Sequence, residues 1–179
     1  MHERIEQFIP DSKITPELLQ DGSFLKKAIN ICNSNRNERN FILLSQILRD
    51  SFVWIPCSAV LSDSDYEAWT KKIAQAQEEG GLDSLSDLTF VNRDEIRMVP
   101  DILQSGENFF FPVFTSAEEM GEYGNRFSKV EKHFLEAMSL ARNNEKKTAG
   151  IVINAFSEPF VVPVEIFDLI AQMKSNFED

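Results

Sequence analysis

Cysteine and histidine are both scarce in this chain, which has 179 residues and two of each. Cys32 and Cys57 lack the CxxC spacing of a zinc or redox motif, and both lie among apolar residues. We therefore expect no disulfide framework, no metal site and no cofactor, and both thiols are predicted to be reduced core residues. His133 is the one histidine outside the N-terminal segment. It falls at the border of a predicted helical apolar stripe, where a half-exposed histidine needs no function.

Long apolar runs are missing as well. The most apolar stretches, 41–48, 52–61 and 150–156, fall short of the ~20 residues that span a bilayer. The first seven residues mix charges where a secretory signal has a basic start and an apolar run. The sequence thus predicts no membrane span and no export signal, and a cytoplasmic location follows.

Positive charge is in short supply. Eighteen Lys and Arg stand against 29 Asp and Glu, which gives a net charge of −11. The basic residues are spread along the chain in pairs such as Lys26-Lys27 and Lys146-Lys147. Such a chain repels phosphate backbones and anionic membrane surfaces. Nucleic acid and membranes are therefore not expected as partners.

Apolar residues, by contrast, make up 42% of the chain, enough for one sizeable core. The length favours one domain. We expect residues 1–20 to form an arm or a short helix, and residues 21–179 to form a single α/β domain in which a small mixed β-sheet is flanked by helices.

The first part of this domain predicts a helical hairpin and a strand. Apolar residues recur at helical spacing over 24–32 and again over 41–48, with a polar break between them. Residues 51–61 are β-branched and aromatic, which favours a strand. Because Pro56 lies inside it, we expect an edge strand or a bulged one.

A third helix is predicted over 66–78. The segment 62–65 (SDSD) resembles its cap, and Gly80-Gly81 ends it. The stretch that follows is mixed, with short strands expected at 88–91 and 96–99.

The second half predicts a buried strand at 108–114 that runs into a helix through a capping box formed by Ser116 and Glu119. A second capping box, Ser128 with Glu131, predicts another helix. Its apolar face is expected to pack on the sheet and consists of Val130, Phe134, Ala137, Met138 and Ala141.

The last part of the chain predicts a hairpin and a helix. Residues 150–154 and 160–162 are short apolar strands around a polar turn. Pro163 then opens a final helix to about residue 174, with Phe167, Ile170 and Ala171 inward.

Three segments of the second half carry a family resemblance. They are 111–119 (FPVFTSAEE), 150–154 (GIVIN) and 160–163 (FVVP). Their order and spacing resemble the N-terminal domain of the SseB family, named for enhanced serine sensitivity, and the resemblance covers residues 24–174. The family pattern usually has proline where this chain has Ala155. The resemblance implies a bacterial α/β domain of undefined biochemical role, with no established catalytic residues.

The junction after the 108–114 strand is a candidate binding site. Hydroxyls at a strand end beside a helix N-terminus are where α/β folds bind anions and small polar ligands, and here they belong to Thr115 and Ser116. Asn154 joins this site if the 150–154 strand lies beside the 108–114 strand. The competing interpretation is that Ser116 only caps its helix.

A second candidate is an apolar surface around Phe110. Phe109, Phe110 and Phe111 are consecutive, so they cannot all point to one side of a strand. At least one of them faces a covering helix, a second copy of the chain or another protein, since aromatic residues dominate both cores and interfaces.

These observations contain no catalytic constellation. The function expected from the sequence is a non-enzymatic protein-interaction or regulatory module whose partner is an unidentified protein or a second copy. The alternative is a small-molecule binding domain or cryptic enzyme with its site near Thr115.

Overall fold

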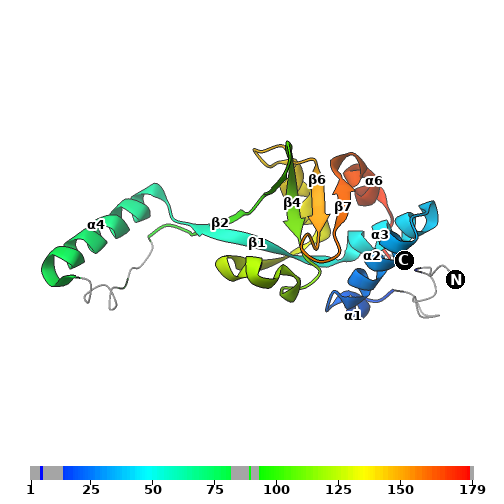
Figure 1. Cartoon of the computed structure of the whole chain (residues 1–179), viewed down its shortest axis with the longest axis horizontal. Coiled ribbons are helices and arrows are strands. Elements are labelled where there is room, and N and C mark those ends of the chain that lie inside the picture. Colours follow the sequence, from blue (N-terminus) through cyan, green and yellow to red (C-terminus); the bar gives the residue numbers. More distant parts are fainter. Residues whose placement is uncertain (1–4, 6–13, 82–88, 90–92, 178–179) are drawn as a thin grey trace. The chain divides into compact units, whose positions relative to one another are not determined.

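A computed structural model describes residues 5, 14–81, 89 and 93–177 of the chain (Figure 1). The chain divides into two compact units: unit 1 is Met1–Cys57 with Pro100–Asp179, and unit 2 is Ser58–Val99. The predicted α/β class is confirmed, although the strands form two sheets rather than one. The predicted boundary after residue 20 stays a prediction. Within the described residues, no helix is both long enough and apolar enough to cross a bilayer.

The larger sheet belongs to unit 1 and has the strand order β3-β4-β6-β7 (Figure 1). β4 (Asn108–Val113) pairs in parallel with β6 (Gly150–Ile153), which confirms that these two predicted strands are neighbours. β7 (Phe160–Pro163) pairs antiparallel with β6 and completes the predicted hairpin. β3 (Leu103–Ser105), which the sequence analysis did not predict, forms a second hairpin with β4.

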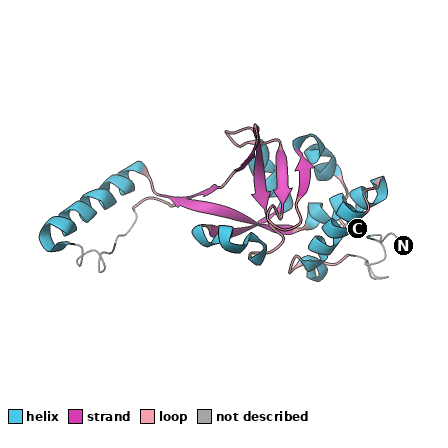
Figure 2. Cartoon of the chain, in the orientation of Figure 1, coloured by secondary structure: helices cyan, strands magenta, loops and turns pink. Residues whose placement is uncertain are grey.

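One face of this sheet is covered by helices. The strand register places Phe111 and Val113 of β4, Ile151 and Ile153 of β6, and Phe160 and Val162 of β7 on the same face. All six are buried in the main core. Helix α5 (Phe134–Arg142) packs on β4 and β6, and it lies behind these strands in Figure 2.

Among the described residues, no helix lies in front of the opposite face of the sheet (Figure 2). We call it the helix-free face, and it is formed by Phe110, Pro112, Val152 and Val161. Pro112 and Val152 in its middle are buried by their neighbours, Phe110 is half-buried, and Val161 is exposed. On the side away from α5, the sheet therefore exposes apolar surface at Val161 and in part at Phe110.

The smaller sheet has the order β2-β1-β5, with β1 (Phe52–Val60) in the centre. The prediction that Pro56 makes this an edge or bulged strand is wrong. β1 pairs residue for residue with β5 (Ser128–His133), from Phe52 opposite His133 to Cys57 opposite Ser128. The Pro56 carbonyl accepts the Asp101 N–H at 2.9 Å on the side away from β5. The missing N–H of Pro56 lies on that same side, so the β1–β5 ladder loses no bond.

The helices before β1 form the predicted hairpin. α1 (Pro16–Leu19) begins with proline at its first turn, and α2 (Ser23–Ser34) packs against α3 (Glu38–Asp50). The Asn37 side chain caps α3 by accepting the Asn40 N–H at 2.9 Å. Most predicted apolar positions of both helices are buried, among them Leu25, Ile29, Leu44 and Ile47, whereas Phe41 is half-buried.

Two predicted helix starts in the second half are wrong. Glu119 does not reach back to Ser116, because it is bound to Lys26 and Ser157 instead. The chain there forms 3₁₀ turns, η3 (Glu118–Arg126), whose N-cap residue Ala117 has no side-chain cap. Residues 128–133 are strand β5 rather than the first turn of a helix, because pairing with β1 overrides the capping pattern.

Helix α5 therefore starts five residues later than its capping box predicted, with His133 rather than Ser128 as the N-cap residue. His133 is its N-cap residue, and its Nδ1 accepts the Leu135 N–H at 3.3 Å. The expected inward face is otherwise confirmed, since Phe134, Ala137, Met138 and Ala141 are buried.

The chain after β7 forms two short pieces rather than one helix. They are η4 (Val164–Ile166) and α6 (Phe167–Gln172). Phe167 and Ile170 are buried as predicted, whereas Ala171 is exposed.

Unit 2 contains helix α4 (Asp63–Gly80), capped by Ser62 as predicted and ended at Gly81. Its buried carboxylate, Asp65, accepts the backbone N–H groups of Arg93 and Asp94 at 3.0–3.1 Å. The predicted strand at 96–99 is confirmed as β2 (Arg97–Pro100). The strand predicted at 88–91 lies, apart from residue 89, outside the described residues.

Candidate protein-binding surface

The predicted junction site brings Thr115 and Asn154 together. The Asn154 Oδ1 accepts the Thr115 N–H at 2.9 Å, and the Asn154 Nδ2 donates to the Thr115 Oγ1 at 3.0 Å. We call this pair the Thr115–Asn154 latch. Its members are 3% and 1% exposed. The polar groups that were expected to meet a ligand are thus used to join the ends of β4 and β6.

The N-terminus of α2 closes over this latch. Gly22 has φ +75° and approaches so closely that a Cβ there would lie 1.9 Å from the Thr115 carbonyl oxygen. Ser116, half-buried beside Thr115, gives its hydroxyl to the Glu118 carboxylate. Glu118 also bonds its own backbone N–H, and together these bonds hold the pKa of its carboxyl below its usual value. Ligand binding at Thr115, Ser116 and Asn154 stays a prediction.

A different part of unit 1 contains a large groove. It has a volume of about 660 Å³ and lies between β7 with η4 on one side and the α2–α3 connection on the other. We call it the edge groove. Its walls are mostly apolar and include Cys32, Phe41, Phe160, Val161, Pro163 and Ile166. Arg36 and Glu38 add one charge of each sign.

β7 ends the strand order of the larger sheet, so one side of its backbone faces this groove. Hydrogen-bonded and non-hydrogen-bonded residue pairs alternate along the antiparallel β6–β7 ladder. The Val164 N–H donates to the Ala149 carbonyl at 3.0 Å, which identifies these two residues as a hydrogen-bonded pair. Val162 exchanges bonds with Ile151, and the backbone groups of Val161 point away from β6. The flanking outward positions are Pro159 and Pro163, which have no N–H. Within β7, Val161 therefore offers the one outward N–H.

The shape of the edge groove is set by packing and one polar contact. The Asn33 Nδ2 donates to the Pro159 carbonyl at 3.3 Å, which ties the end of α2 to the start of β7. Cys32 is almost fully buried, and burial raises the pKa of its thiol despite the opposing effect of Arg36. Val161 is 44% exposed and belongs both to the groove and to the helix-free face. The two apolar surfaces are continuous at this residue.

Phe110 lies on the helix-free face, opposite Leu103 of β3 and Gly150 of β6. Its two neighbours in the run point to the other face, where Phe111 is buried and the Phe109 ring contacts the Lys146 ammonium, 5.4 Å from the ring centroid. The described part of the chain places no covering helix, which the sequence offered as one explanation for Phe110, on this face (Figure 2). A partner for Phe110 stays a prediction.

An aromatic cluster lies beyond the ends of β4 and β6. Tyr123 packs against Phe127 and Phe156, with centroids 4.9 and 4.7 Å apart, and Phe156 stacks on Phe114. The Arg126 guanidinium lies over the Tyr123 and Phe127 rings. Burial and a hydrogen bond to Asp101 raise the pKa of Tyr123 far above its usual value. Tyr123 therefore serves as a fixed hydrogen-bond donor rather than as an acid or a base.

His133 and the two cysteines also have pKa values that are shifted mainly by burial. Burial is the main cause of the lowered pKa of His133, and its Nδ1 is occupied by the helix cap. Burial raises the pKa of Cys57, and both cysteines are unpaired and buried. Among the described residues, no three His, Cys, Asp or Glu side chains are placed to hold a metal ion.

The sequence analysis did not identify the edge groove. It arises where the α2–α3 connection meets β7, and residues so distant in sequence carry no shared local pattern. The available signal was the pair of prolines at 159 and 163, which bracket an apolar tripeptide and are typical of an edge strand.

Comparison with known proteins identifies a family. Residues 25–165 match the SseB protein N-terminal domain. No curated protein and no solved structure matches the chain. The matched range covers most of α2, all of α3 and the larger sheet, and most of the edge groove. The resemblance seen in the strand motifs is confirmed. The chain therefore belongs to the SseB family and carries its N-terminal domain.

Proposed function

We propose that this domain is a non-enzymatic protein-binding module that holds an extended segment of a partner protein in the edge groove. The observation that carries the proposal is the coincidence of a groove of about 660 Å³ with the outward backbone edge of β7. Grooves of this size and apolar character are where proteins bind ligands, and a sheet edge binds extended peptides by strand addition.

The chemistry of β7 defines the segment that fits. Val161 presents one outward N–H and one outward C=O. A strand bound at this edge can therefore form two backbone hydrogen bonds with Val161, but it cannot form a long ladder with β7. The prolines on either side prevent further pairing, as they do on protected edges. Most of the affinity must then come from side chains that enter the groove beside Phe41, Phe160 and Ile166. A short extended segment with one or two bulky apolar residues matches this surface.

Charge favours another protein over a second copy of this chain. Each copy carries −11, so two copies repel one another at moderate ionic strength. A partner segment flanked by basic residues is attracted instead, which raises its association rate and makes binding sensitive to salt. Self-association, the other partner predicted from the sequence, is the less favoured outcome.

Support for the absence of catalysis comes from the state of the reactive side chains. The cysteines and Tyr123 have raised pKa values, so they hold their protons, and His133 is engaged as a cap. Cys32 lines the edge groove, but its raised pKa keeps it from acting as an ionised nucleophile there. Cys57, Tyr123 and His133 do not line the groove. The alternative of a ligand-binding domain or enzyme near Thr115 stays a prediction, and the latch variants described below test it.

A linear-peptide selection on the native protein tests the proposal. Peptides that bind are expected to shift the amide resonances of Val161, Phe41 and Ile166. Val161→Pro removes the one outward N–H of β7 and is expected to weaken the selected peptides at least tenfold, as is Phe41→Ser. Phe110→Ser should weaken only those peptides that extend over the helix-free face.

Leu140→Ser is the matched control, since Leu140 is an equally exposed apolar residue on α5. Circular dichroism confirms that each variant is folded. Peptides that bind Val161→Pro as tightly as the wild type, or that shift resonances elsewhere, would overturn the proposal. So would a native protein that selects no peptide at all.

A further inference from the structure

A second pocket of unit 1 lies away from the edge groove and has a different character. Its volume is about 330 Å³, and it is formed by α1, the α3–β1 junction, β5 and the C-terminal segment. Two phenylalanine rings and three carboxylate side chains line it, from Phe52, Phe177, Glu17, Asp50 and Glu131. We call it the Phe52–Phe177 pocket.

Both phenylalanines are exposed to solvent. Phe52 is 51% exposed and Phe177 is 43% exposed. The Phe52 ring is held edge-on against His133, with centroids 5.2 Å apart at 89°. The face of an aromatic ring is the negative pole of its quadrupole, so exposed ring faces attract cations as well as apolar groups. Two such rings in one pocket favour a ligand that has both properties.

The charged side chains that line the pocket are all acidic, and of these Asp50 is paired with Arg49 at 2.7 Å, which leaves Glu17 and Glu131 as the carboxylates open to a ligand. None of the described residues that line it is Lys or Arg. The Glu17 carboxyl bonds its own backbone N–H and the Thr15 hydroxyl, and these bonds lower its pKa. Glu131 extends from the face of β5 that also carries His133, which pairs with Phe52. Burial lowers the pKa of His133, which disfavours a positive imidazolium beside these carboxylates.

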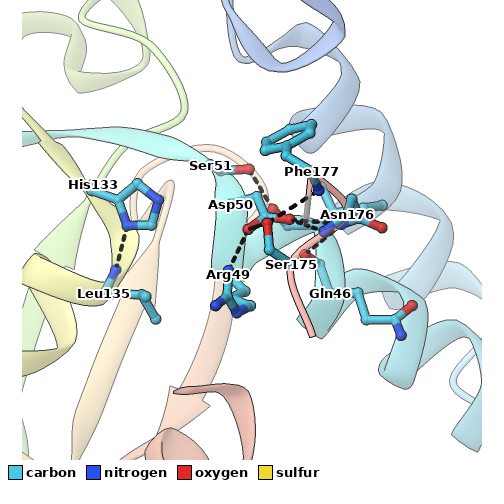
Figure 3. A network of polar contacts seen from close by, with 10 residues as sticks. Gln46, Arg49, Asp50, Ser51, His133, Leu135, Ser175, Asn176 and Phe177 are labelled. Carbon is cyan, nitrogen blue, oxygen red and sulfur yellow. Dashed lines mark hydrogen bonds and ion pairs between the residues drawn. The ribbon is translucent and has the colours of Figure 1, made fainter. Parts of the chain in front are cut away.

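The walls of the pocket are held in place by a partly buried hydrogen-bond network around Asp50 (Figure 3). Asp50 Oδ2 accepts the Asn176 backbone N–H at 2.7 Å and its Nδ2 at 2.8 Å, and Oδ1 accepts from Ser175 and Arg49. The Asn176 Nδ2 also lies 3.2 Å from the Gln46 carbonyl. These bonds anchor the C-terminal segment and fix the backbone of the adjoining Phe177. A preformed pocket binds without having to order its walls first.

We propose that the Phe52–Phe177 pocket binds an organic cation, a primary ammonium or guanidinium group on an alkyl stem, against the two rings and opposite Glu17 and Glu131. Such a group presents a charge to the carboxylates and methylenes to the phenylalanines. The group belongs either to a small amine or to a Lys or Arg side chain of another protein. This site and the edge groove are independent of one another.

A titration followed by amide resonances of the full chain tests the proposal. n-Butylammonium is expected to shift Phe52, Glu131 and Phe177 saturably, and to bind at least tenfold more tightly than butan-1-ol, which has the same stem without the charge. Raising NaCl from 20 to 500 mM should weaken it severalfold. N-acetyl-lysine methylamide distinguishes the sources: tighter binding than n-butylammonium indicates a protein side chain, and weaker binding indicates a free amine.

Variants locate the site. Phe52→Leu and Glu131→Gln are each expected to weaken n-butylammonium at least fivefold. Phe177→Leu should do the same while leaving the Asn176 bonds in place. Leu169→Ser and Glu165→Gln, at exposed positions outside the pocket, are the controls. All five residues are exposed, so melting temperatures should stay close to that of the wild type.

The proposal is overturned if the alcohol binds as well as the cation, if no resonance shifts at 50 mM n-butylammonium, or if the pocket variants bind like the controls. Val161→Pro should leave the cation affinity unchanged. Failure at this pocket is therefore distinguishable from failure at the edge groove.

Discussion

Asn154→Ala offers the sharpest test of whether the Thr115–Asn154 latch is structural. The substitution leaves the buried Thr115 N–H without an acceptor, which costs about 1–3 kcal/mol. Asn154 also has φ +50°, and a residue with a Cβ but no polar side chain pays about 1–2 kcal/mol in this left-handed conformation. The expected loss in the free energy of unfolding is therefore about 2–5 kcal/mol. Urea titration followed by circular dichroism measures it, with an unchanged m value as the check on two-state behaviour.

Two companion variants separate the contributions. Asn154→Gly removes the same bonds but relieves the backbone, so its loss should be smaller by about 1 kcal/mol. Thr115→Val keeps the N–H bond and removes only the hydroxyl, for a loss of about 1 kcal/mol. A loss below about 0.5 kcal/mol for Asn154→Ala, the range of an ordinary surface change, would refute the structural latch and return Thr115 and Asn154 to the status of ligand-binding candidates.

Three further predictions follow from buried contacts. Gly22→Ala should lower the free energy of unfolding, measured in urea, by about 2–5 kcal/mol, because the new Cβ meets the Thr115 carbonyl and φ is +75°. Gly106→Ala, at φ +60° with no atom nearby, should lower it by about 1–2 kcal/mol. Equal losses for the two variants would contradict the close approach of Gly22 to Thr115. Burial alone would raise the pKa of Asp50, but the hydrogen bonds that it accepts have the larger combined effect and lower the pKa. The ionised carboxylate therefore stabilises the fold above the unfolded pKa of ~3.9, and this stabilisation is lost as pH falls through the folded pKa. Urea midpoints from pH 7 to 2 should fall steeply below about pH 4 in the wild type and less in Asp50→Asn; parallel curves would exclude this role. Because burial raises their pKa values, Cys32 and Cys57 should react with a thiol reagent at pH 8 at least a hundredfold faster in 8 M urea than in the native state, and rapid native labelling would show that the thiols are accessible.

Local sequence patterns predicted the elements whose signals lie within one segment. The helical hairpin of α2 and α3, the cap of α4 at Ser62 and the hairpin of β6 and β7 all follow from apolar spacing and turn residues. The Ser128–Glu131 pattern misled because Ser-x-x-Glu also occurs in strands, and pairing of Val130 with Ile55 decides the matter. The prediction from Pro56 was wrong because a proline weakens a strand only where its missing N–H would have bonded a neighbouring strand. The strands on either side of β1 decide this, and the sequence of β1 alone does not show them.

The candidate sites show the same division. Thr115 and Asn154 were correctly placed together, since the ends of neighbouring parallel strands meet at one edge of a sheet. The sequence did not show that Thr115 and Asn154 hydrogen-bond to one another and are covered by Gly22. This arrangement depends on how α2 packs over the end of the sheet. The edge groove and the Phe52–Phe177 pocket join residues more than a hundred positions apart, and no single segment of the sequence carries their signature.

The bond between the Asp101 N–H and the Pro56 carbonyl has a consequence for engineering. It joins the point where the chain leaves unit 1 to the point where it returns, so we expect the larger sheet and its helices to stay folded when residues 58–99 are replaced. The entropy of closing a loop grows slowly with its length, so a tight turn or a foreign module grafted between Cys57 and Pro100 should be tolerated equally. A reporter, an affinity tag or a second recognition element inserted between Cys57 and Pro100 is expected to leave the edge groove and the Phe52–Phe177 pocket intact.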